Sequence, residues 1–436
     1  MIILHPMNEL HNTRSIALSI LADILIKNHS RDESLKRYLS TEKHLSEQDR
    51  AFIFNIVMNT LRYKEVFDEI TEKILNRPIQ HINKDILLAI DIALAQTLTL
   101  DNIPLYASVF ETIEGYKESK NRNSRSIGFL NYALRRITQN SSIDELFAQY
   151  QNQNRLIQKL QNHLCDELSE KEIIGIYKTS FQRPRTAIRI NNKVIDTNDA
   201  LKELHNNGIS ARSSEIVANA IILETDTPFA RLYEILPAEG FTFQSELSQL
   251  AAYLLSLKKG YSLLDVCSGN QIKVGQIKEL FPEDLEITSI DIKKNHRPIG
   301  RYIQADARNI RLDMQFDRIL LDAPCSGLGT LAYNPEIKFR INRESIIRHS
   351  KIQYQILSNI GKYTKQGGRL LYSVCTITGS ETEKNIMKFL EENREFEIIN
   401  PVMNSSILRQ YLTQEGFLRI FDYNNNSFFY ALLERR

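Results

Sequence analysis

Two cysteines in the C-terminal half of the chain, Cys325 and Cys375, each follow an apolar segment that reads as a β-strand. Neither has a histidine beside it in the sequence, which argues against the Cys–His pair of a protease-like hydrolase. A thiolate could instead add to C6 of a cytosine ring and thereby make C5 nucleophilic. A carboxylic acid at N3 would assist this addition, a base would later remove the C5 proton, and Asp322 suits the acid role. The alternative is that both cysteines are ordinary buried thiols.

Four aspartates stand at or near the ends of consecutive predicted strands: Asp265, Asp291, Asp306 and Asp322. In an open α/β sheet, ligands bind at the carboxyl ends of the strands. Asp291 lies roughly 20 positions beyond Gly269, the separation at which a carboxylate meets a nucleoside ribose in Rossmann-like sites. A single such aspartate is more often a helix cap than a ligand. Four of them favour a nucleoside cofactor site, and the lack of G-x-G-x-x-G after the first strand argues against a dehydrogenase.

The elements that position these residues begin at about residue 240, where helix and strand alternate. Strands are predicted at 262–267, 286–292, 301–306, 317–324, 369–375 and 427–433. Short apolar strands separated by helices are typical of a parallel sheet that is covered on both faces. Before this region, segments 186–192, 198–208 and 215–224 give a β-α-β pattern, which indicates a small α+β unit.

The first part of the chain, up to about residue 140, reads as helix. Apolar residues recur at helical spacing in segments 15–26, 50–63, 85–98 and 126–137, and Pro78 and Pro104 fall in breaks between helices. A polar helical stretch, 145–180, follows. Cations cluster around the last of the four segments: Lys117, Lys120, Arg122, Arg125, Arg135 and Arg136. They form either a solvated helix end or a phosphate-contacting surface.

Composition limits the class of protein. The chain has 436 residues, is 42% hydrophobic and 25% charged, and carries a formal net charge of +2. It can therefore form packed cores in about three domains, while its charge neither demands nor excludes a nucleic acid. We expect no membrane span, no secretory signal and no metal site. Four cysteines without disulfide or metal spacing indicate a cytoplasmic protein.

Several motifs resemble the RNA 5-methylcytosine methyltransferase family, and most closely its RsmB-type branch. They are DAPCSGLGT (322–330), NPEIKFR (334–340) and GGRLLYSVCTI (367–377). The N-terminal segments LRY (61–63) and FLNYALRR (129–136) look like the NusB-type RNA-binding fold that this branch carries. RPRTAIRINN (183–192) resembles the family's small domain, and FTFQSELSQ (241–249) resembles the segment that opens the catalytic domain, which usually has Asp where Ser245 stands.

The resemblance covers nearly the whole chain and implies three domains. These are a NusB-like helical RNA-binding domain (1–142), a helical connector plus small α+β RNA-binding domain (143–240), and a Rossmann-like S-adenosylmethionine-dependent methyltransferase domain (241–436). It implies methylation of cytosine C5 in ribosomal RNA, with 16S rRNA of the small subunit as the expected substrate. We expect a cytoplasmic monomer that binds RNA through the six cations named above and Arg189.

Carried over residue by residue, the resemblance implies that Cys375 attacks C6 and that Cys325 assists breakdown of the covalent adduct. Asp322 would stand near the cofactor methionine and the target ring, Asp291 would bond the ribose hydroxyls, and Asp306 would face the adenine. The loop after the first strand would also bind S-adenosylmethionine. It comprises Cys267, Ser268, Gly269, Asn270, Gln271, Ile272 and Lys273.

This loop departs from the family pattern D-x-C-A-A-P-G-G-K, since the chain reads DVCSGNQIK (265–273). Gln271 and Ile272 replace glycines that let the backbone approach the cofactor with unusual φ and ψ. Isoleucine resists a positive φ. We expect Gly269 and Asn270 to supply part of the lost conformational freedom, because asparagine tolerates the left-handed region.

Two further departures lie nearby. The stretch between Asp291 and Asp306 is too short for a helix plus the next strand, and Ala332 and Tyr333 stand where an Arg pair is usual. An alternative hypothesis is therefore a catalytically weakened RNA-binding or ribosome-assembly factor that keeps the fold. Retention of both cysteines favours an active enzyme.

Overall fold

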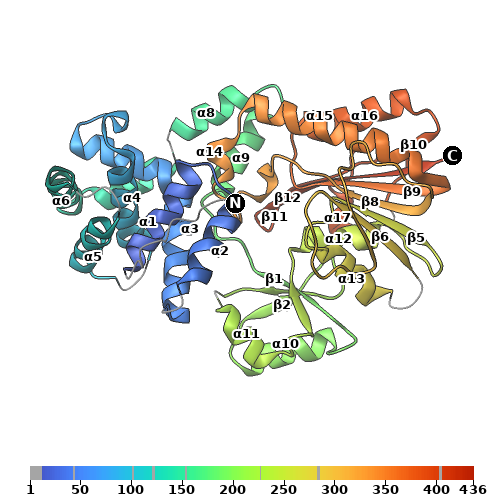
Figure 1. The fold of residues 1–436 in the computed structure, drawn as a ribbon, viewed down its shortest axis with the longest axis horizontal. Helices are drawn as coiled ribbons and strands as arrows, with labels where there is room; N and C mark the ends of the chain where they lie inside the picture. The colour runs from blue at the N-terminus through green and yellow to red at the C-terminus, as the bar shows by residue number, and fades with distance from the viewer. Residues whose placement is uncertain are drawn as a thin grey trace, which may run out of the picture. The chain divides into compact units, whose positions relative to one another are not determined.

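The structure, a computed structural model, describes residues 12–42, 45–100, 103–119, 123–152, 155–225, 227–281, 285–401 and 405–436. The chain divides into two compact units. Unit 1 comprises Met1–Asn162 with Lys338–Arg340, and unit 2 comprises His163–Ile337 with Ile341–Arg436. Figure 1 shows helices in the first unit and two sheets with their covering helices in the second.

Unit 1 is helical in its described residues, as the apolar spacing predicts. Ser46 begins the longest helix with a capping box, in which the Ser46 hydroxyl and the Asp49 carboxylate each accept from the other residue's amide. Pro78 and Pro104 lie immediately before helical segments, where a missing N–H does no harm. The helices are α1 (Thr13–Leu25), α2 (Arg31–Thr41), α3 (Glu47–Leu75), η1 (Ile79–His81), α4 (Lys84–Thr99), α5 (Leu105–Glu118), α6 (Ser124–Thr138), α7 (Ile143–Asn152) and most of α8 (Arg155–Leu164); most of α14 (Ile337–Arg340) also belongs to this unit.

The first sheet of unit 2 is small and antiparallel, with its strands in the order β2-β3-β1-β4. Two helices pack against it through Leu204 and Leu232, which share a buried core with Ile188 and Ile221. The predicted small α+β domain is confirmed. Its elements follow helix α9 (Glu170–Thr179) and are β1 (Ala187–Ile190), α10 (Thr197–Asn206), β2 (Ala211–Ser213), β3 (Ala220–Leu223), α11 (Phe229–Ile235) and β4 (Phe241–Phe243).

The second sheet has eight strands in the order β10-β12-β9-β8-β5-β6-β7, with β11 paired to β12. The strands are β5 (Ser262–Val266), β6 (Glu286–Asp291), β7 (Arg301–Gln304), β8 (Phe316–Asp322), β9 (Thr364–Val374), β10 (Phe396–Ile398), β11 (Leu418–Tyr423) and β12 (Asn426–Arg435). The helices and 3₁₀ turns around it are α12 (Glu246–Leu254), α13 (Ile272–Leu280), η2 (Leu328–Thr330), α15 (Arg343–Ile360), η3 (Gly361–Tyr363), η4 (Gly379–Glu381), α16 (Glu383–Glu392) and α17 (Ser406–Arg409).

Helices cover both faces of this sheet, as predicted. Successive residues of a strand point to opposite faces. In β5, Leu263 therefore joins a buried cluster with Leu250 of α12, whereas Leu264 joins another with Leu357 of α15. Figure 1 shows α15 and α16 on one side of the strands and α12 and α13 on the other.

The predicted parallel sheet is only partly right. Strands β7, β6, β5, β8 and β9 are parallel, but β12 runs antiparallel to β9, and both β10 and β11 run antiparallel to β12. Strand β11 is antiparallel to β12 because a tight hairpin joins them, which turns through Asn424 and Asn425, both with positive φ. Within the described residues, the structure has no helix long and apolar enough to cross a membrane.

Candidate active site

The parallel strands bring the predicted site residues to one edge of the sheet. Val266 of β5 pairs with Ile290 of β6 and with Leu321 of β8, so Asp291 and Asp322 follow it at the same level. Asp322 in turn pairs with Ser373 of β9. The loops that follow these strands therefore meet at the carboxyl edge, where α/β proteins bind ligands.

The structure brings the two predicted reactive cysteines into contact. The sulfur atoms of Cys325 and Cys375 lie 3.3 Å apart, within hydrogen-bonding distance. Gly329 lies between the two loops, and its amide donates to the Cys375 carbonyl at 3.0 Å. A Cβ at Gly329 would lie 2.0 Å from the Ser427 carbonyl oxygen, so no other residue fits there without movement of the backbone.

Two of the cysteines at this edge have raised pKa values. The hydrogen bond with Cys375, together with burial, raises the pKa of Cys325 well above its ordinary value. Burial and the nearby carboxylates, Asp291 first among them, also raise the pKa of Cys267. Both groups therefore remain neutral thiols near neutral pH. The fourth cysteine, Cys165, is exposed and lies outside this site.

A lysine and an aspartate form an ion pair beside the cysteines. Lys273, in the first turn of α13, donates to the Asp322 carboxylate, and the Ser373 hydroxyl donates to the same carboxylate at 3.3 Å. Burial acts to lower the pKa of Lys273, but Asp322 and Asp265 outweigh it and leave this pKa above its ordinary value. Burial likewise raises the pKa of Asp265 to about 8, in spite of Lys273.

The loop after β5 adopts three left-handed residues. They are Cys267 (φ 62°), Gly269 (φ 52°) and Gln271 (φ 56°). Gly269 is expected in this role, but Asn270 is not left-handed and Gln271 is, so the prediction for Asn270 was wrong. The loop is held by Asp291, whose carboxylate accepts from the amides of Gly269 and Lys293, both at 2.8 Å.

The side chain of Gln271 explains how the chain tolerates this conformation. It is only 2% exposed, and its amide nitrogen donates to Ser289 Oγ (2.8 Å) and to the Ile299 carbonyl (3.0 Å). Its amide oxygen accepts from Asn295 Nδ2 (2.8 Å) and the Ile299 amide (2.9 Å). The segment 292–300 has no helix, as its length predicts. Gln271 ties this shortened segment to β6, so two departures from the family pattern form one structural unit.

The site fits a nucleoside cofactor in several respects. A Cβ added at Gly269 would meet no atom within 4 Å, so this backbone faces open space. Asp265 has a buried carboxylate oxygen without a hydrogen-bond partner. Ile292, next to Asp291, is 69% exposed, so an apolar surface lies beside the strand-end aspartate. Sequence reasoning did not single out Ile292, although its place after the strand-end aspartate is a usable signal.

Asp306 lies at the same edge but is already paired. Arg308 donates to both of its carboxylate oxygens, at 2.6 to 3.0 Å, and these bonds lower the pKa of Asp306. The carboxylate would have to share its oxygens with an adenine amino group. Within the described residues, no cluster of His, Cys, Asp and Glu could hold a metal ion.

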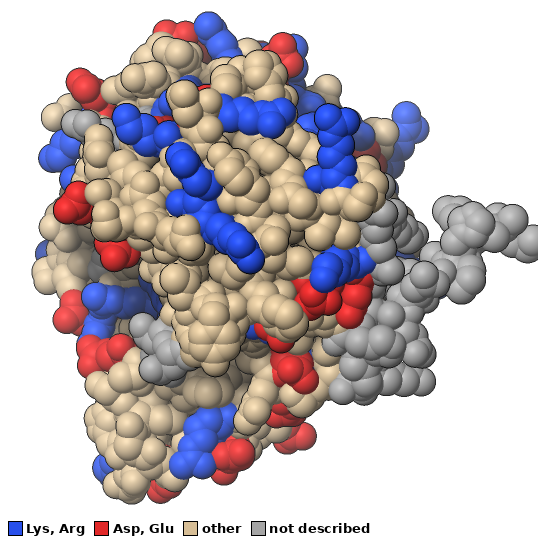
Figure 2. Space-filling view, turned by 90° about the vertical axis from the view of Figure 1, so that its left-hand side faces the viewer, with Lys and Arg blue, Asp and Glu red and all other residues tan. Residues whose placement is uncertain are grey.

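The predicted RNA-binding cations fall into different environments. Arg125, Arg135 and Arg136 are exposed on α6, and Tyr132 between them is 53% exposed. Lys117 pairs with Glu114 of its own helix at 2.6 Å. Lys120 and Arg122 lie outside the described residues. Figure 2 shows the side of unit 1 on which α5 and α6 lie, with Lys and Arg gathered on its upper part.

The structure contradicts the prediction that Arg189 binds RNA. It is 2% exposed, and its guanidinium is held by both carboxylate oxygens of Glu279, each at 2.7 Å, and by Gln244. A guanidinium enclosed in this way cannot reach a phosphate. Arg189 instead joins the small domain to α13 through Glu279.

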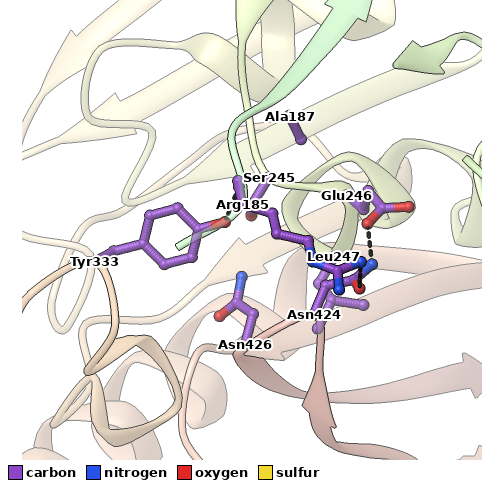
Figure 3. A pocket seen from close by; sticks show the side chains of 8 residues that line it. All are labelled: Arg185, Ala187, Ser245, Glu246, Leu247, Tyr333, Asn424 and Asn426. Carbon is purple, nitrogen blue, oxygen red and sulfur yellow. Dashed lines mark hydrogen bonds between the residues drawn. The ribbon is translucent and has the colours of Figure 1, made fainter. Parts of the chain in front are cut away.

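A small polar cavity lies between the small domain and the loops of the large sheet (Figure 3). Its volume is about 10 Å³, which is room for about one water molecule. The Tyr333 hydroxyl donates to the Arg185 carbonyl at 2.8 Å, and Asn424 links the Arg185 guanidinium (3.2 Å) to Glu246 (2.7 Å). This cavity is too small for a nucleobase. The hydrogen bonds of the side chains around it connect the start of β1 to the β11–β12 turn.

The fold and the site define a class. An α/β sheet with a nucleoside-type loop and strand-end aspartates at its carboxyl edge is the catalytic domain of a Rossmann-like methyltransferase. Comparisons with known families agree: residues 252–434 match 16S rRNA methyltransferase RsmB/F, residues 11–139 match the NusB family, and residues 156–230 match the ferredoxin-like domain of RsmF/B-like methyltransferases. Through these three segments, the chain is similar to the RsmB/F family of rRNA methyltransferases.

Individual relatives extend over nearly the whole chain. The ribosomal RNA small subunit methyltransferase B of Proteus mirabilis is 29% identical and covers 99% of this chain and 100% of its own length. The probable ribosomal RNA small subunit methyltransferase B of Bacillus subtilis is 27% identical, over 88% of this chain and 90% of its own length.

Solved structures share the fold. That of PH0851 has a TM-score of 0.73 at 21% identity and covers 97% of this chain and 99% of its own. NSun6 from Pyrococcus horikoshii, solved with SFG, has a TM-score of 0.53 at 17% identity, over 64% of this chain and 97% of its own. The predicted three-part architecture is thereby confirmed.

Proposed function

We propose that this protein methylates C5 of a cytosine in small-subunit rRNA, with S-adenosylmethionine as the methyl donor and a covalent bond between Cys375 and C6 as the intermediate. The observation that carries the proposal is the contact between Cys325 and Cys375, 3.3 Å apart, at the sheet edge where Asp322 also ends its strand. Two thiols in contact beside a paired carboxylate suit covalent activation of a ring, whereas methyl transfer to an already nucleophilic nitrogen needs neither.

Each residue then has a definite task. The Cys375 thiolate forms a bond to C6 while N3 takes a proton from the Lys273–Asp322 pair, and the ring becomes enamine-like at C5. S-adenosylmethionine supplies the electrophilic methyl group. A base then takes the C5 proton, and N3 returns its proton to the Lys273–Asp322 pair. The electrons of the C5–H bond restore the C5–C6 double bond as the bond between Cys375 and C6 breaks, which regenerates the thiolate. Cys325, a thiol of raised pKa in contact with Cys375, assists this release.

The cofactor would be held by the β5 loop and the strand ends. Residues 267–273 would surround its amino-acid part, Asp291 would accept from the ribose hydroxyls, and Ile292 and Asp306 would face the adenine. SFG, present in the NSun6 structure, is an analogue of S-adenosylmethionine. The filled hydrogen bonds of Gln271 support a loop that is ordered in spite of its unusual sequence.

The RNA substrate would be bound mostly through phosphate contacts and shape. Arg125 and Arg135 flank Tyr132 on the exposed face of α6, an arrangement that suits phosphates beside a stacked base. The target cytosine must leave its stack, at a cost of a few kcal/mol, to reach Cys375. We also propose the domain ranges 1–142, 143–240 and 241–436, and that the protein acts as a cytoplasmic monomer.

The proposal is tested with S-adenosylmethionine labelled in its methyl group and 16S rRNA that lacks the modification. We expect label in 5-methylcytosine with the wild-type protein and none with Cys375→Ala. Label at another atom, or none with folded wild-type protein, contradicts the proposal.

A second candidate is a catalytically weakened RNA-binding or assembly factor that retains the fold. The observation that favours it is the pairing of Asp306 with Arg308, which competes with the adenine. Calorimetry with S-adenosylmethionine separates the two functions. A dissociation constant in the micromolar range supports the enzyme, and one in the millimolar range or no binding supports the second candidate.

A further inference from the structure

A buried carboxylate outside the residues of the proposed chemistry lies between the two cysteine loops. Glu381, in η4, is fully buried. Its Oε1 atom accepts from the Ser326 amide at 2.8 Å and from Gln353 Nε2 at 3.0 Å. Its Oε2 atom accepts from the hydroxyls of Thr378 at 2.8 Å and Thr376 at 3.5 Å. Both oxygens are therefore used, and all four donors are neutral groups.

Three of the four donors come from the segments that carry the cysteines. Ser326 directly follows Cys325, and Thr376 directly follows Cys375. Gln353 of α15 also donates to the carbonyl of Pro324, the residue before Cys325, at 3.0 Å. One side chain thus gathers backbone or side-chain groups from both loops.

Three more bonds complete this network. The hydroxyls of Ser326 and Thr376 are 3.0 Å apart, which links the two loops directly. The Tyr372 hydroxyl, from the end of β9, donates to the Glu381 carbonyl at 2.7 Å. Asn385 of α16 holds Gln353 in place through a bond to its amide oxygen at 3.1 Å. Glu381 is therefore held by Tyr372 of the strand and by Gln353 of α15, and Asn385 of α16 holds Gln353 in turn.

A carboxylate that merely anchored α16 would bind groups of that helix. The carboxylate of Glu381 instead binds Ser326 and Thr376, the residues that directly follow the two cysteines. Buried donors that lose their acceptor carry the full cost of desolvation, so the loops separate or rearrange when the carboxylate is removed. The two segments are also joined by the Ser326–Thr376 contact, by the Ser373–Asp322 bond and by the bond from the Gly329 amide to the Cys375 carbonyl.

We propose that Glu381 is a positioning residue that fixes the two cysteine loops against each other and so sets the contact between Cys325 and Cys375. Glu381 does not touch the substrate. Its consequence for catalysis rests on the proposed function, but its consequence for the distance between the thiols does not.

The first test measures that distance chemically. Diamide removes two electrons and two protons from a pair of thiols, forms a disulfide and becomes a hydrazine, at a rate that depends on how closely the thiols are held. Closure of the Cys325–Cys375 disulfide is followed by peptide mass spectrometry. Glu381→Ala is expected to slow closure at least tenfold.

Two variants separate geometry from charge and from general destabilisation. Glu381→Gln keeps an acceptor for Ser326 and Gln353, and the threonine hydroxyls can accept from its amide, so closure is expected within threefold of wild type. Ile386→Ala removes a fully buried side chain from the neighbouring helix without touching the network and is expected to leave the closure rate unchanged. Closure by Glu381→Ala at the wild-type rate, equal slowing by Ile386→Ala, or Glu381→Gln as slow as Glu381→Ala overturns the proposal.

A milder variant covers the case in which Glu381→Ala does not fold. Thr378→Val removes one donor and keeps the shape of the side chain, and it is expected to slow closure two- to fivefold. Closure at the wild-type rate in Thr378→Val overturns the proposal in that case. In methylation assays, Glu381→Ala and Thr378→Val are expected to lower kcat with KM for S-adenosylmethionine unchanged. If no variant and not even the wild type methylates RNA, the proposed function fails, and the closure rates still decide the role of Glu381.

Discussion

Replacement of Gln271 by glycine would restore the residue type that the family pattern has at this position, yet the structure predicts that it weakens the site. The Gln271 side chain is buried and makes four hydrogen bonds, two of them to Ile299. Three of these bonds hold Asn295 and Ile299 in the segment 292–300, which follows Asp291 and has no helix of its own.

The magnitude follows from the balance of two effects. Four buried hydrogen bonds contribute about 4 kcal/mol in total, at about 1 kcal/mol each. Glycine recovers roughly 1–2 kcal/mol, because Gln271 has a φ of 56°, where a Cβ is unfavourable. The Gln271→Gly variant should therefore destabilise the segment by about 2–3 kcal/mol. Gln271→Ala loses the same bonds without this relief and should cost about 4 kcal/mol.

Amide hydrogen exchange of unit 2 measures this local stability. Exchange at Ile299 should accelerate roughly 30- to 150-fold in Gln271→Gly, since every 1.4 kcal/mol is a factor of ten, and further in Gln271→Ala. Calorimetry should show weaker binding of S-adenosylmethionine in the same order. Asn270→Gly is the matched control for the exchange measurement, because Asn270 is an exposed neighbour in the same loop with a negative φ.

Protection of Ile299 in Gln271→Gly equal to that of wild type would refute this reasoning. So would tighter cofactor binding by Gln271→Gly than by wild type, because it would mean that the left-handed strain outweighs the four hydrogen bonds.

Three further predictions concern pH, packing and RNA. Because folding raises the pKa of Asp265 to about 8, the folded protein holds this proton more tightly than the unfolded chain. The associated stability is complete below about pH 4 and is lost as the pH rises to about 8, and urea unfolding followed by circular dichroism should show a flatter pH profile in Asp265→Asn. Gly329→Ala should abolish methylation and slow disulfide closure, since its Cβ would lie 2.0 Å from a carbonyl oxygen. Gly128 of α6 is the matched comparison, because a Cβ there meets no atom, so Gly128→Ala should stabilise unit 1 by up to about 1 kcal/mol. Arg135→Ala should reduce the slope of RNA affinity against log salt by about 0.7–0.9, while Arg189→Ala should leave the slope unchanged and lower stability.

Each of these has a contradicting outcome. An identical pH profile in Asp265→Asn would mean that this carboxyl group is not the source of the dependence. Wild-type activity in Gly329→Ala would show that the loops have room that the structure denies. A reduced salt slope in Arg189→Ala would place this guanidinium on the RNA in spite of its burial.

The sequence is informative about the sheet and its edge for a physical reason. Strands such as 262–267 and 369–375 are short and apolar, and their polar continuations must meet where parallel strands end. This is enough to predict that Cys325 and Cys375 lie near each other. The antiparallel edge was missed because β10 is a strand of only three residues, Phe396–Ile398, and β11 depends on pairing with β12 across a hairpin.

Side-chain partners that are remote in the sequence could not be predicted. The sequence does not show which carboxylate pairs with a given cation. Arg189 was therefore predicted to be a surface cation, although it pairs with Glu279, 90 positions away. Intrinsic preference favours Asn270 for the left-handed position, but the buried hydrogen bonds of Gln271 outweigh it. Glu381 carries no signal in a single sequence beyond its place shortly after Cys375, because its role depends on donors from two loops.

The most direct test of the central claim is capture of the covalent intermediate. Cys325→Ala is mixed with S-adenosylmethionine and labelled 16S rRNA that lacks the methyl group, and the products are separated under denaturing conditions. The account predicts a protein–RNA species that survives denaturation in Cys325→Ala and is absent from the Cys325→Ala, Cys375→Ala double variant. Methylation of C5 by Cys375→Ala, or an adduct that persists in the double variant, would contradict it.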